Sequence, residues 1–198
     1  MSQRIYNFAA GPAVLPRPVL EEAQRDLLAL PDVGMSVMEM SHRSKTIEEF
    51  MQSAEDNIRK LAGIPNNYRI LFLQGGASLQ FSMVPMNLLT PDGKADHIVT
   101  GSFAKLAFQD AQRVGQINLA GSTESEGFVR VPTQGELQLD PEADYLHITT
   151  NNTIFGTEWK TEPVTGQVPL VADASSNIFS KPIDVAKYGL IYAGAQKN

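Results

Sequence analysis

The 198-residue chain contains no cysteine, which excludes disulfide bridges and thiolate metal sites within it. No stretch approaches the roughly 20 apolar residues that a membrane-spanning helix needs, and the first residues lack the apolar core of a secretion signal. Lys and Arg number 16 against 22 Asp and Glu, and they form no basic patch of the kind that nucleic-acid backbones require. We therefore expect a soluble, cytoplasmic protein that binds neither nucleic acid nor a membrane, and no metal site.

The composition is that of a globular protein, with 42% apolar and 19% charged residues. The length suffices for one substantial domain with a buried core. Segments rich in strand formers alternate with segments of helical periodicity, which is the pattern of a parallel sheet covered by helices. We expect an α/β fold of three layers, α/β/α, with a mostly parallel central sheet.

Apolar periodicity predicts two helices in the first third of the chain. One covers 18–30, with Pro18 in its first turn. The other opens with Thr46 and Glu49 in capping-box spacing and stops at Gly63. The apolar stripe of this second helix is expected to lie in the core.

Strand and helix patterns alternate in the rest of the chain. One helix follows a glycine pair and should be kinked or ended by Pro85, and another covers 103–114. The polar segment 121–138 contains Gly and Pro and predicts a surface excursion shaped as a hairpin. Strands are expected at 68–74, 97–100, 116–119, 145–150, 168–172 and 189–192.

The residues that follow the expected strands are the most informative, because ligands of open α/β sheets bind beyond the carboxyl ends of strands. They are Gly75-Gly76-Ala77-Ser78, Gly101-Ser102-Phe103, Asn151-Asn152-Thr153, Asp173-Ala174-Ser175-Ser176 and Ala193-Gly194-Ala195-Gln196-Lys197. A glycine pair ahead of a helix lets backbone amides approach an anion. Each residue also has an ordinary explanation on its own, such as a tight turn, a helix cap, a surface lysine or a core aromatic.

Taken together, these residues favour one cofactor. A phosphate cradle, a ring-stacking group, a carboxylate and an amine are the parts needed to hold pyridoxal phosphate. The amine of Lys197 would form a Schiff base with the cofactor aldehyde, and the carboxylate of Asp173 would pair with the pyridinium nitrogen. A non-catalytic phosphate-binding α/β domain, in which Lys197 is incidental, remains an alternative.

Five sequence blocks resemble the phosphoserine aminotransferases, a family in the class V branch of the fold-type I aminotransferases. The blocks are Asn7-Phe8 with Gly11-Pro12-Ala13, the segment from Ser36 to Arg43, Leu73 to Ser78, Ala172 to Ser176, and Pro182 to Asn198. The resemblance runs from one end of the chain to the other. It implies that residues 1–198 are the N-terminal part of the cofactor-binding large domain, since family members are nearly twice as long.

The resemblance also implies roles for residues around the cofactor ring. Lys197 would be the Schiff-base lysine and proton shuttle, and Asp173 the partner of the ring nitrogen. Thr153 would bond the phenolic oxygen. Many members have tryptophan where this chain has Phe103, but phenylalanine still offers a face for stacking.

Further roles follow for the phosphate and the substrate. Backbone amides of Ala77 and Ser78, the Ser78 hydroxyl and Gln196 would hold the cofactor phosphate, although some members have arginine in place of Ser78. Arg43, with His42 beside it, falls where the family grips the acidic end of its substrates.

The activity that the resemblance implies is amino transfer between L-glutamate and 3-phosphohydroxypyruvate, which gives O-phosphoserine and 2-oxoglutarate on the route to serine. Family members act as homodimers, so a second copy of the chain is the expected partner, and this half alone is expected to be inactive. The alternative within the same fold type is an aminotransferase for alanine, glyoxylate or a sulfur amino acid.

Overall fold

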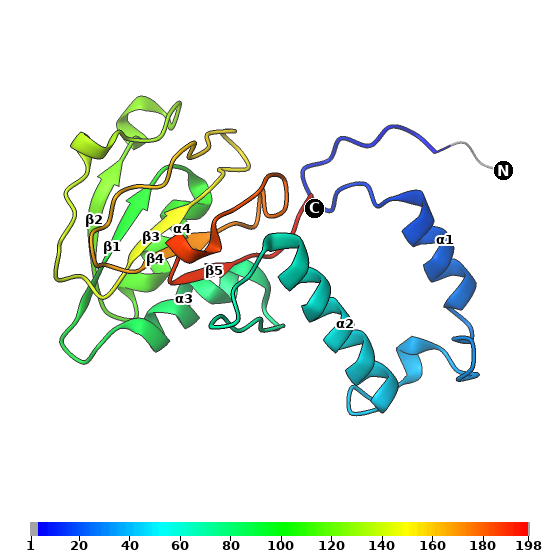
Figure 1. Cartoon of the computed structure of the whole chain (residues 1–198). Coiled ribbons are helices and arrows are strands. Elements are labelled where there is room, and N and C mark those ends of the chain that lie inside the picture. The colour runs from blue at the N-terminus through cyan, green and yellow to red at the C-terminus, as the bar shows by residue number, and fades with distance from the viewer. Residues whose placement is uncertain (1–3, 198) are drawn as a thin grey trace. The chain divides into compact units, whose positions relative to one another are not determined.

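The computed structural model describes residues 4–197, which fall into two compact units divided between Ile70 and Leu71. Each unit is described by itself. The first contains only helices, and the second contains the sheet (Figure 1). Within residues 4–197, none of the helices combines the length and the apolar character needed to cross a membrane.

The first unit contains α1 (Arg17–Asp26), the short 3-10 helix η1 (Val37–Glu39) and α2 (Lys45–Ala62). Helix α1 has Pro18 in its first turn as predicted, but it ends four residues before the expected position 30. Pro31 contributes to the difference, because it has no N–H to donate to the carbonyl of Leu27 and it disfavours the helical conformation at Leu30. Leu30 instead accepts hydrogen bonds from the backbone N–H groups of Val33 and Gly34 in a turn.

Helix α2 matches the prediction at its end but not at its start. Gly63 terminates it with a left-handed backbone (φ 62°). The start is capped by Ser44, whose hydroxyl accepts the N–H of Ile47 at 3.4 Å, so the expected capping box of Thr46 and Glu49 is wrong. Ser44 stands one residue ahead of the helix, which is where a side-chain oxygen reaches the free amides.

The apolar stripe of α2 is not part of a core, contrary to the prediction. No residue of α2 is buried, and the exposed fraction is 45% for Phe50, 43% for Met51 and 70% for Leu61. Among the described residues of this unit, only Ser36 is buried. Two helices and one 3-10 turn offer too little surface to enclose these side chains.

The second unit is built on a sheet of five parallel strands (Figure 1). The strands are β1 (Lys94–Val99), β2 (Gln116–Ser122), β3 (Leu146–Thr149), β4 (Leu170–Asp173) and β5 (Leu190–Tyr192), in the spatial order β2-β1-β3-β4-β5. After β2 the chain returns to the other side of β1, so the strand order reverses between β1 and β3. Ligand sites of open α/β sheets are found at such a reversal.

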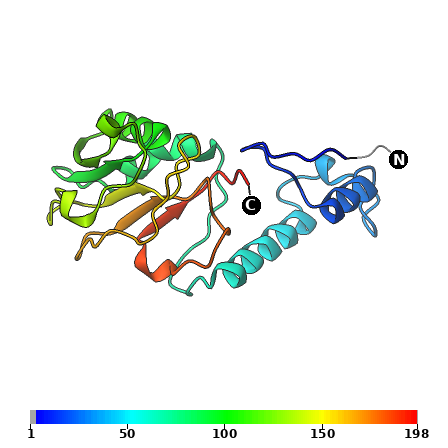
Figure 2. The ribbon, with the colours of Figure 1, turned by 90° about the horizontal axis from the view of Figure 1, so that it is seen from above.

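Helices α3 (Gly76–Leu88) and α4 (Ser102–Gln112) lie on one face of the sheet, while connecting segments cover the other (Figure 2). The helix-covered face buries a cluster of Phe81, Val84, Ala95, Ala107, Ala111, Ile117, Tyr145, Val171 and Tyr192. The opposite cluster contains Ile98, Ala120, Ala143, Leu146, Ile148, Trp159, Val168, Leu170, Ala172 and Tyr188. The predicted α/β class with a parallel sheet is confirmed.

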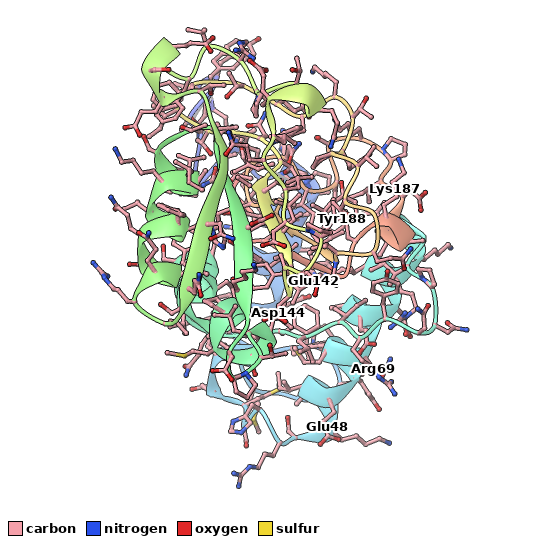
Figure 3. All side chains as sticks on the ribbon, turned by 90° about the vertical axis from the view of Figure 1, so that its left-hand side faces the viewer. Glu48, Arg69, Glu142, Asp144, Lys187 and Tyr188 are labelled. Carbon is pink, nitrogen blue, oxygen red and sulfur yellow. The ribbon has the colours of Figure 1, made fainter. Side chains whose placement is uncertain are left out.

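The connections on the second face are fastened by polar side chains. Lys187 is the last residue of the 3-10 helix η4 (Val185–Lys187), and Tyr188 follows it directly; both are labelled in Figure 3. Tyr188 donates a hydrogen bond to Glu162 at 2.9 Å, and Lys187 donates one at 3.0 Å.

Asp144, also labelled in Figure 3, precedes β3 and accepts the N–H of Thr90 at 2.9 Å. This hydrogen bond ties the segment after α3 to the sheet.

Two histidines are enclosed on the helix-covered face. The rings of His97 and His147 are 4.6 Å apart and stacked, and both side chains are buried. Nε2 of His97 lies 3.4 Å from the hydroxyl of Tyr145, and Nε2 of His147 lies 2.9 Å from the hydroxyl of Tyr192. Burial lowers the pKa of His147 to about 4, and burial and the neighbouring His147 bring the pKa of His97 well below its usual value.

Three expectations about elements of this chain are corrected. Residues 68–74 form no strand, because no neighbouring strand pairs with them among the described residues. Segment 121–138 is no hairpin: 121–122 extend β2, and the rest contains the 3-10 helices η2 (Glu124–Glu126) and η3 (Gln134–Glu136). Helix α3 continues three residues past Pro85, which is buried inside it, so Pro85 does not end the helix; the alternative of a kink stays a prediction.

Candidate active site

A cavity of about 360 Å³ opens at the carboxyl ends of β1, β3, β4 and β5, within the second unit. This volume is in the range of small-molecule sites. It is lined by Gly76, Ala77, Ser78, Phe81, Phe103, Thr149, Asn151, Thr153, Asp173, Ser175, Ser176, Gly194, Ala195 and Gln196. Six of the residues predicted to bind a cofactor are therefore brought together: Ala77, Ser78, Phe103, Thr153, Asp173 and Gln196.

The glycine turn places the start of α3 at the cavity. Gly75 and Gly76 have φ values of 91° and 61°, a left-handed backbone that side chains rarely permit. No side chain caps the helix, so its first amides are directed at the cavity with the positive end of the helix dipole. Gly194 comes close to this turn, and a Cβ there would lie 3.1 Å from the backbone nitrogen of Ala77. The site thus leaves open the approach of an anion to Ala77 and Ser78.

The carboxylate of Asp173 lies at the end of β4 and is 3% exposed. Its Oδ1 accepts the backbone N–H of Ser175 at 2.9 Å. Burial raises the pKa of Asp173, and the hydrogen bonds from Ser175 oppose that effect. A cation or N–H donor bound in the cavity would stabilise the charged carboxylate.

Phe103 and Thr153 line the cavity from the two strands that flank the reversal of strand order. Phe103 is in the first turn of α4 after β1, where it also packs against the buried cluster of the helix-covered face. Phe103 is therefore both a residue packed against the core and a residue of the cavity wall, the two possibilities that the sequence had left open. Thr153 follows β3, and its hydroxyl donates to Oε1 of Gln196 at 3.1 Å.

Lys197 reaches the wall of the same cavity. Its amine donates to Oε1 of Gln196 at 3.0 Å and to the hydroxyl of Ser176 at 2.9 Å, and both partners line the cavity. Gln196 is thereby shared between Lys197 and Thr153. Asp173 is the last residue of β4, and Lys197 lies in the segment that follows β5; the two strands are parallel neighbours, so their carboxyl ends are aligned.

Arg43 and His42 belong to the first unit, whereas the residues that line the cavity belong to the second. They lie in an exposed turn just before α2, where the backbone N–H of Arg43 donates to the hydroxyl of Ser41 at 3.2 Å. Their role in substrate binding stays a prediction.

The sequence interpretation missed four polar residues at the strand ends. Asn151 and Ser176 line the cavity, and Asn152 is 2% exposed beneath it. Thr149 also lines the cavity, is 4% exposed, and its Oγ1 has no hydrogen-bond partner in the described structure. Asn151, Asn152 and Ser176 were named among the residues that follow predicted strands but were given no role, and Thr149 lies inside the strand predicted at 145–150. Their contacts depend on neighbouring strands and are not visible in the sequence.

Asn152 joins the loops that carry Phe103 and Thr153. Its Nδ2 donates to the hydroxyls of Thr100 and Thr157, each at 3.1 Å. A Cβ at Gly101 would lie 2.4 Å from Oδ1 of Asn152, so only glycine leaves room for this amide. The network fixes the ends of β1 and β3 on the two sides of the cavity. Among residues 4–197, no group of three or more acidic or histidine side chains is placed so that it could hold a metal ion.

Comparisons with known proteins identify similar sequences and similar folds. The phosphoserine aminotransferase of Lysinibacillus sphaericus is 54% identical over 198 residues, which are 100% of this chain and 55% of that protein. The structure of phosphoserine aminotransferase from Bacillus circulans subsp. alkalophilus matches with a TM-score of 0.95 and 47% identity, over 100% of this chain and 55% of that one. The PLP-bound phosphoserine aminotransferase from Trichomonas vaginalis gives 0.91 and 38%, over 98% and 55%.

The chain spans about 55% of the length of these relatives. The sequence profile described as aminotransferase class-V matches residues 5–198, nearly the whole chain. The chain therefore belongs to the class-V aminotransferase family.

Proposed function

We propose that the protein containing this chain is a pyridoxal-phosphate-dependent phosphoserine aminotransferase. It transfers an amino group between L-glutamate and 3-phosphohydroxypyruvate and gives O-phosphoserine and 2-oxoglutarate. In this proposal residues 1–198 are the N-terminal part of the large domain, and the whole protein is a cytoplasmic homodimer. The observation that carries the proposal is the convergence of the buried Asp173 carboxylate, the Lys197 amine and the free amides of α3 on one cavity.

The residues present fit this cofactor by three independent features. The first amides of α3, at Ala77 and Ser78, offer an anion site for a phosphate. The Asp173 carboxylate is buried, and within residues 4–197 its hydrogen bonds come from Ser175 alone, which leaves an oxygen for a protonated ring nitrogen. The unpartnered hydroxyl of Thr149 beside it supplies a further polar contact inside the cavity.

Pyridoxal phosphate, when bound, supplies an aldehyde that takes up the amino group and an electron-withdrawing ring. Asp173 would keep the ring nitrogen protonated, and the face of Phe103 would orient the ring. Thr153 would bond the phenolic oxygen, and Gln196 would assist at the phosphate. Lys197 would hold the cofactor covalently, then remove the α-proton of the substrate as a general base and return it to the cofactor.

Substrate selection in this proposal falls to Arg43 with His42. A planar guanidinium meets two anionic oxygens at once, which suits a phosphate or a side-chain carboxylate. Both side chains are exposed in the first unit. The similarity to phosphoserine aminotransferases at 54% identity supports an acidic substrate over alanine or glyoxylate.

The experiment that tests the function uses the intact natural protein. After incubation with pyridoxal phosphate and reduction with borohydride, peptide mapping should find the cofactor on Lys197, and Lys197→Ala should lose glutamate–phosphohydroxypyruvate transamination. Lys160→Ala is the matched control, because Lys160 is exposed and pairs with Glu158. Label on another lysine, or turnover by the Lys197 variant, would contradict the proposal.

A further inference from the structure

Ser176 is the residue of the cavity that most directly contacts Lys197. It lies in the loop after β4, is 6% exposed and lines the cavity. Its carbonyl oxygen is 3.2 Å and its Oγ 2.9 Å from Nζ of Lys197. The hydrogen of the Ser176 hydroxyl is engaged elsewhere, because Oγ donates to Oδ1 of Asn151 at 2.5 Å. The lone pairs of Oγ are thereby turned toward the amine.

The number of acceptors matches a protonated amine. An ammonium group has three N–H donors and no acceptor. Ser176 supplies two oxygens to Lys197, and Oε1 of Gln196 supplies the third. All three oxygens are uncharged, and Lys197 forms no ion pair with a carboxylate within residues 4–197.

We propose that Ser176 is a positioning residue for Lys197, and that it receives the amine of Lys197 after this amine has taken the α-proton of the substrate. This role rests on the function proposed above. The neutral Nζ forms a new N–H bond with the α-proton, and the electron pair of the broken C–H bond stays on the substrate side. The three N–H groups then find the two oxygens of Ser176 and Oε1 of Gln196. Asn151 acts through Ser176, because it fixes the direction of the hydroxyl.

The first test measures the amine without cofactor. In the cofactor-free natural protein, Ser176→Ala should raise the rate of Lys197 acetylation by trace acetic anhydride, relative to Lys160, roughly three- to tenfold, the effect of losing one partly exposed hydrogen bond to a charged group. Mass spectrometry of the labelled peptides gives this ratio. Ser176→Thr keeps the hydroxyl and should resemble the natural protein. Ser180→Ala, an exposed serine of the same loop, is the matched control.

The second test measures proton removal in the cofactor-loaded protein. Ser176→Ala should lower kcat about tenfold and leave KM within about a factor of two, because the lost hydrogen bond stabilises the amine only once it is charged. With a substrate deuterated at the α-carbon, the isotope effect on kcat should rise in Ser176→Ala and return to the natural value in Ser176→Thr. Ser176→Cys keeps the side-chain volume and tests the same points if the alanine variant unfolds.

The two proposals fail in different ways. If the natural protein takes no cofactor on Lys197, the proposed function itself is wrong. If it takes the cofactor there, but Ser176→Ala matches Ser180→Ala in both Lys197 labelling and isotope effect, only the role of Ser176 is overturned. A uniform rise in labelling of all lysines would mean that Ser176 supports the fold, and it would also overturn the proposal.

Discussion

Asp173 carries a carboxylate whose burial has a cost for folding, and this cost is tolerated at a site where the charge has a use. Because the pKa is raised in the folded state, the folded protein disfavours the ionised form relative to the unfolded chain. The cost is absent below the unfolded pKa of about 3.9 and grows as the pH rises through the raised folded value. Folding stability therefore does not account for this buried carboxylate, whereas the contact proposed for it with the cofactor does.

Asp173→Asn is expected to separate these two effects. The cofactor-free variant should unfold at a temperature equal to or above that of the natural protein at neutral pH, and the difference should vanish in acid. Turnover should fall by orders of magnitude, since a neutral amide cannot keep the ring nitrogen protonated. Thermal unfolding at several pH values and a transaminase assay measure the two. Near-normal turnover with cofactor bound would reduce Asp173 to a turn residue.

Arg43 is expected to discriminate between substrates. Hydrogen bonds between charged groups contribute about 1.5–3 kcal/mol, which corresponds to about one to two decades in affinity. Arg43→Ala should therefore lower kcat/KM by that factor for phosphoserine and glutamate and hardly alter it for alanine. Arg43→Lys should recover part, because an ammonium lacks the planar fork. Equal losses for alanine and phosphoserine would show that Arg43 supports the fold or the cofactor instead.

The ends of β1 and β3, on the two sides of the cavity, are linked by the side chain of Asn152. Gly101 has an extended backbone, so the reason for glycine there is steric, not conformational: a Cβ would collide with Asn152. Gly101→Ala should cost about 1–3 kcal/mol of unfolding free energy, as overpacking does, and weaken cofactor binding by moving Phe103. In Gly135→Ala the new Cβ would have no atom within 4 Å, so the unfolding free energy should change by less than about 0.5 kcal/mol. Urea unfolding of both variants checks this, and equal stabilities would contradict the steric account.

The sequence predicted those elements best whose patterns are local. The apolar runs before Asp173 and Lys197 predicted β4 and β5, because buried parallel strands are apolar on both faces. A strand at 68–74 was predicted from the same kind of run but fails, since a strand also needs a partner that its own sequence does not reveal. The contact of Ser176 with Lys197 was missed for a related reason: it joins residues 21 positions apart.

At the scale of the whole molecule, the two stacked histidines predict how stability depends on pH. The unfolded chain begins to bind protons at His147 below a pH of about 6.5, whereas the folded protein does so only near its pKa of about 4. Stability is therefore complete above the first value and is lost as the pH falls toward the second. The loss from His147 totals about 3 kcal/mol. The hydroxyls of Tyr145 and Tyr192 are the titratable groups in hydrogen-bond contact with the pair among the described residues.

Urea unfolding of the natural protein, His147→Gln and His42→Gln in this pH window measures the effect. The slope of unfolding free energy against pH should flatten in His147→Gln, whatever its absolute stability. His42 is exposed, so His42→Gln should keep the natural slope. An unchanged slope in His147→Gln would show that other groups govern the loss of stability in acid.

The reversal of strand order between β1 and β3 has a consequence for divergence among relatives. The contacts of the cavity come from five segments of the chain, at 76–81, 103, 149–153, 173–176 and 194–196, and each segment is distant in sequence from the next. A substitution in one loop can therefore change one contact and leave the inherited sheet and the remaining contacts intact. In the family that the sequence resembles, many members have tryptophan at the position of Phe103 and some have arginine at the position of Ser78, and each of these exchanges alters one contact of the cavity. The arrangement lets natural selection adjust individual contacts of the cavity at separate positions.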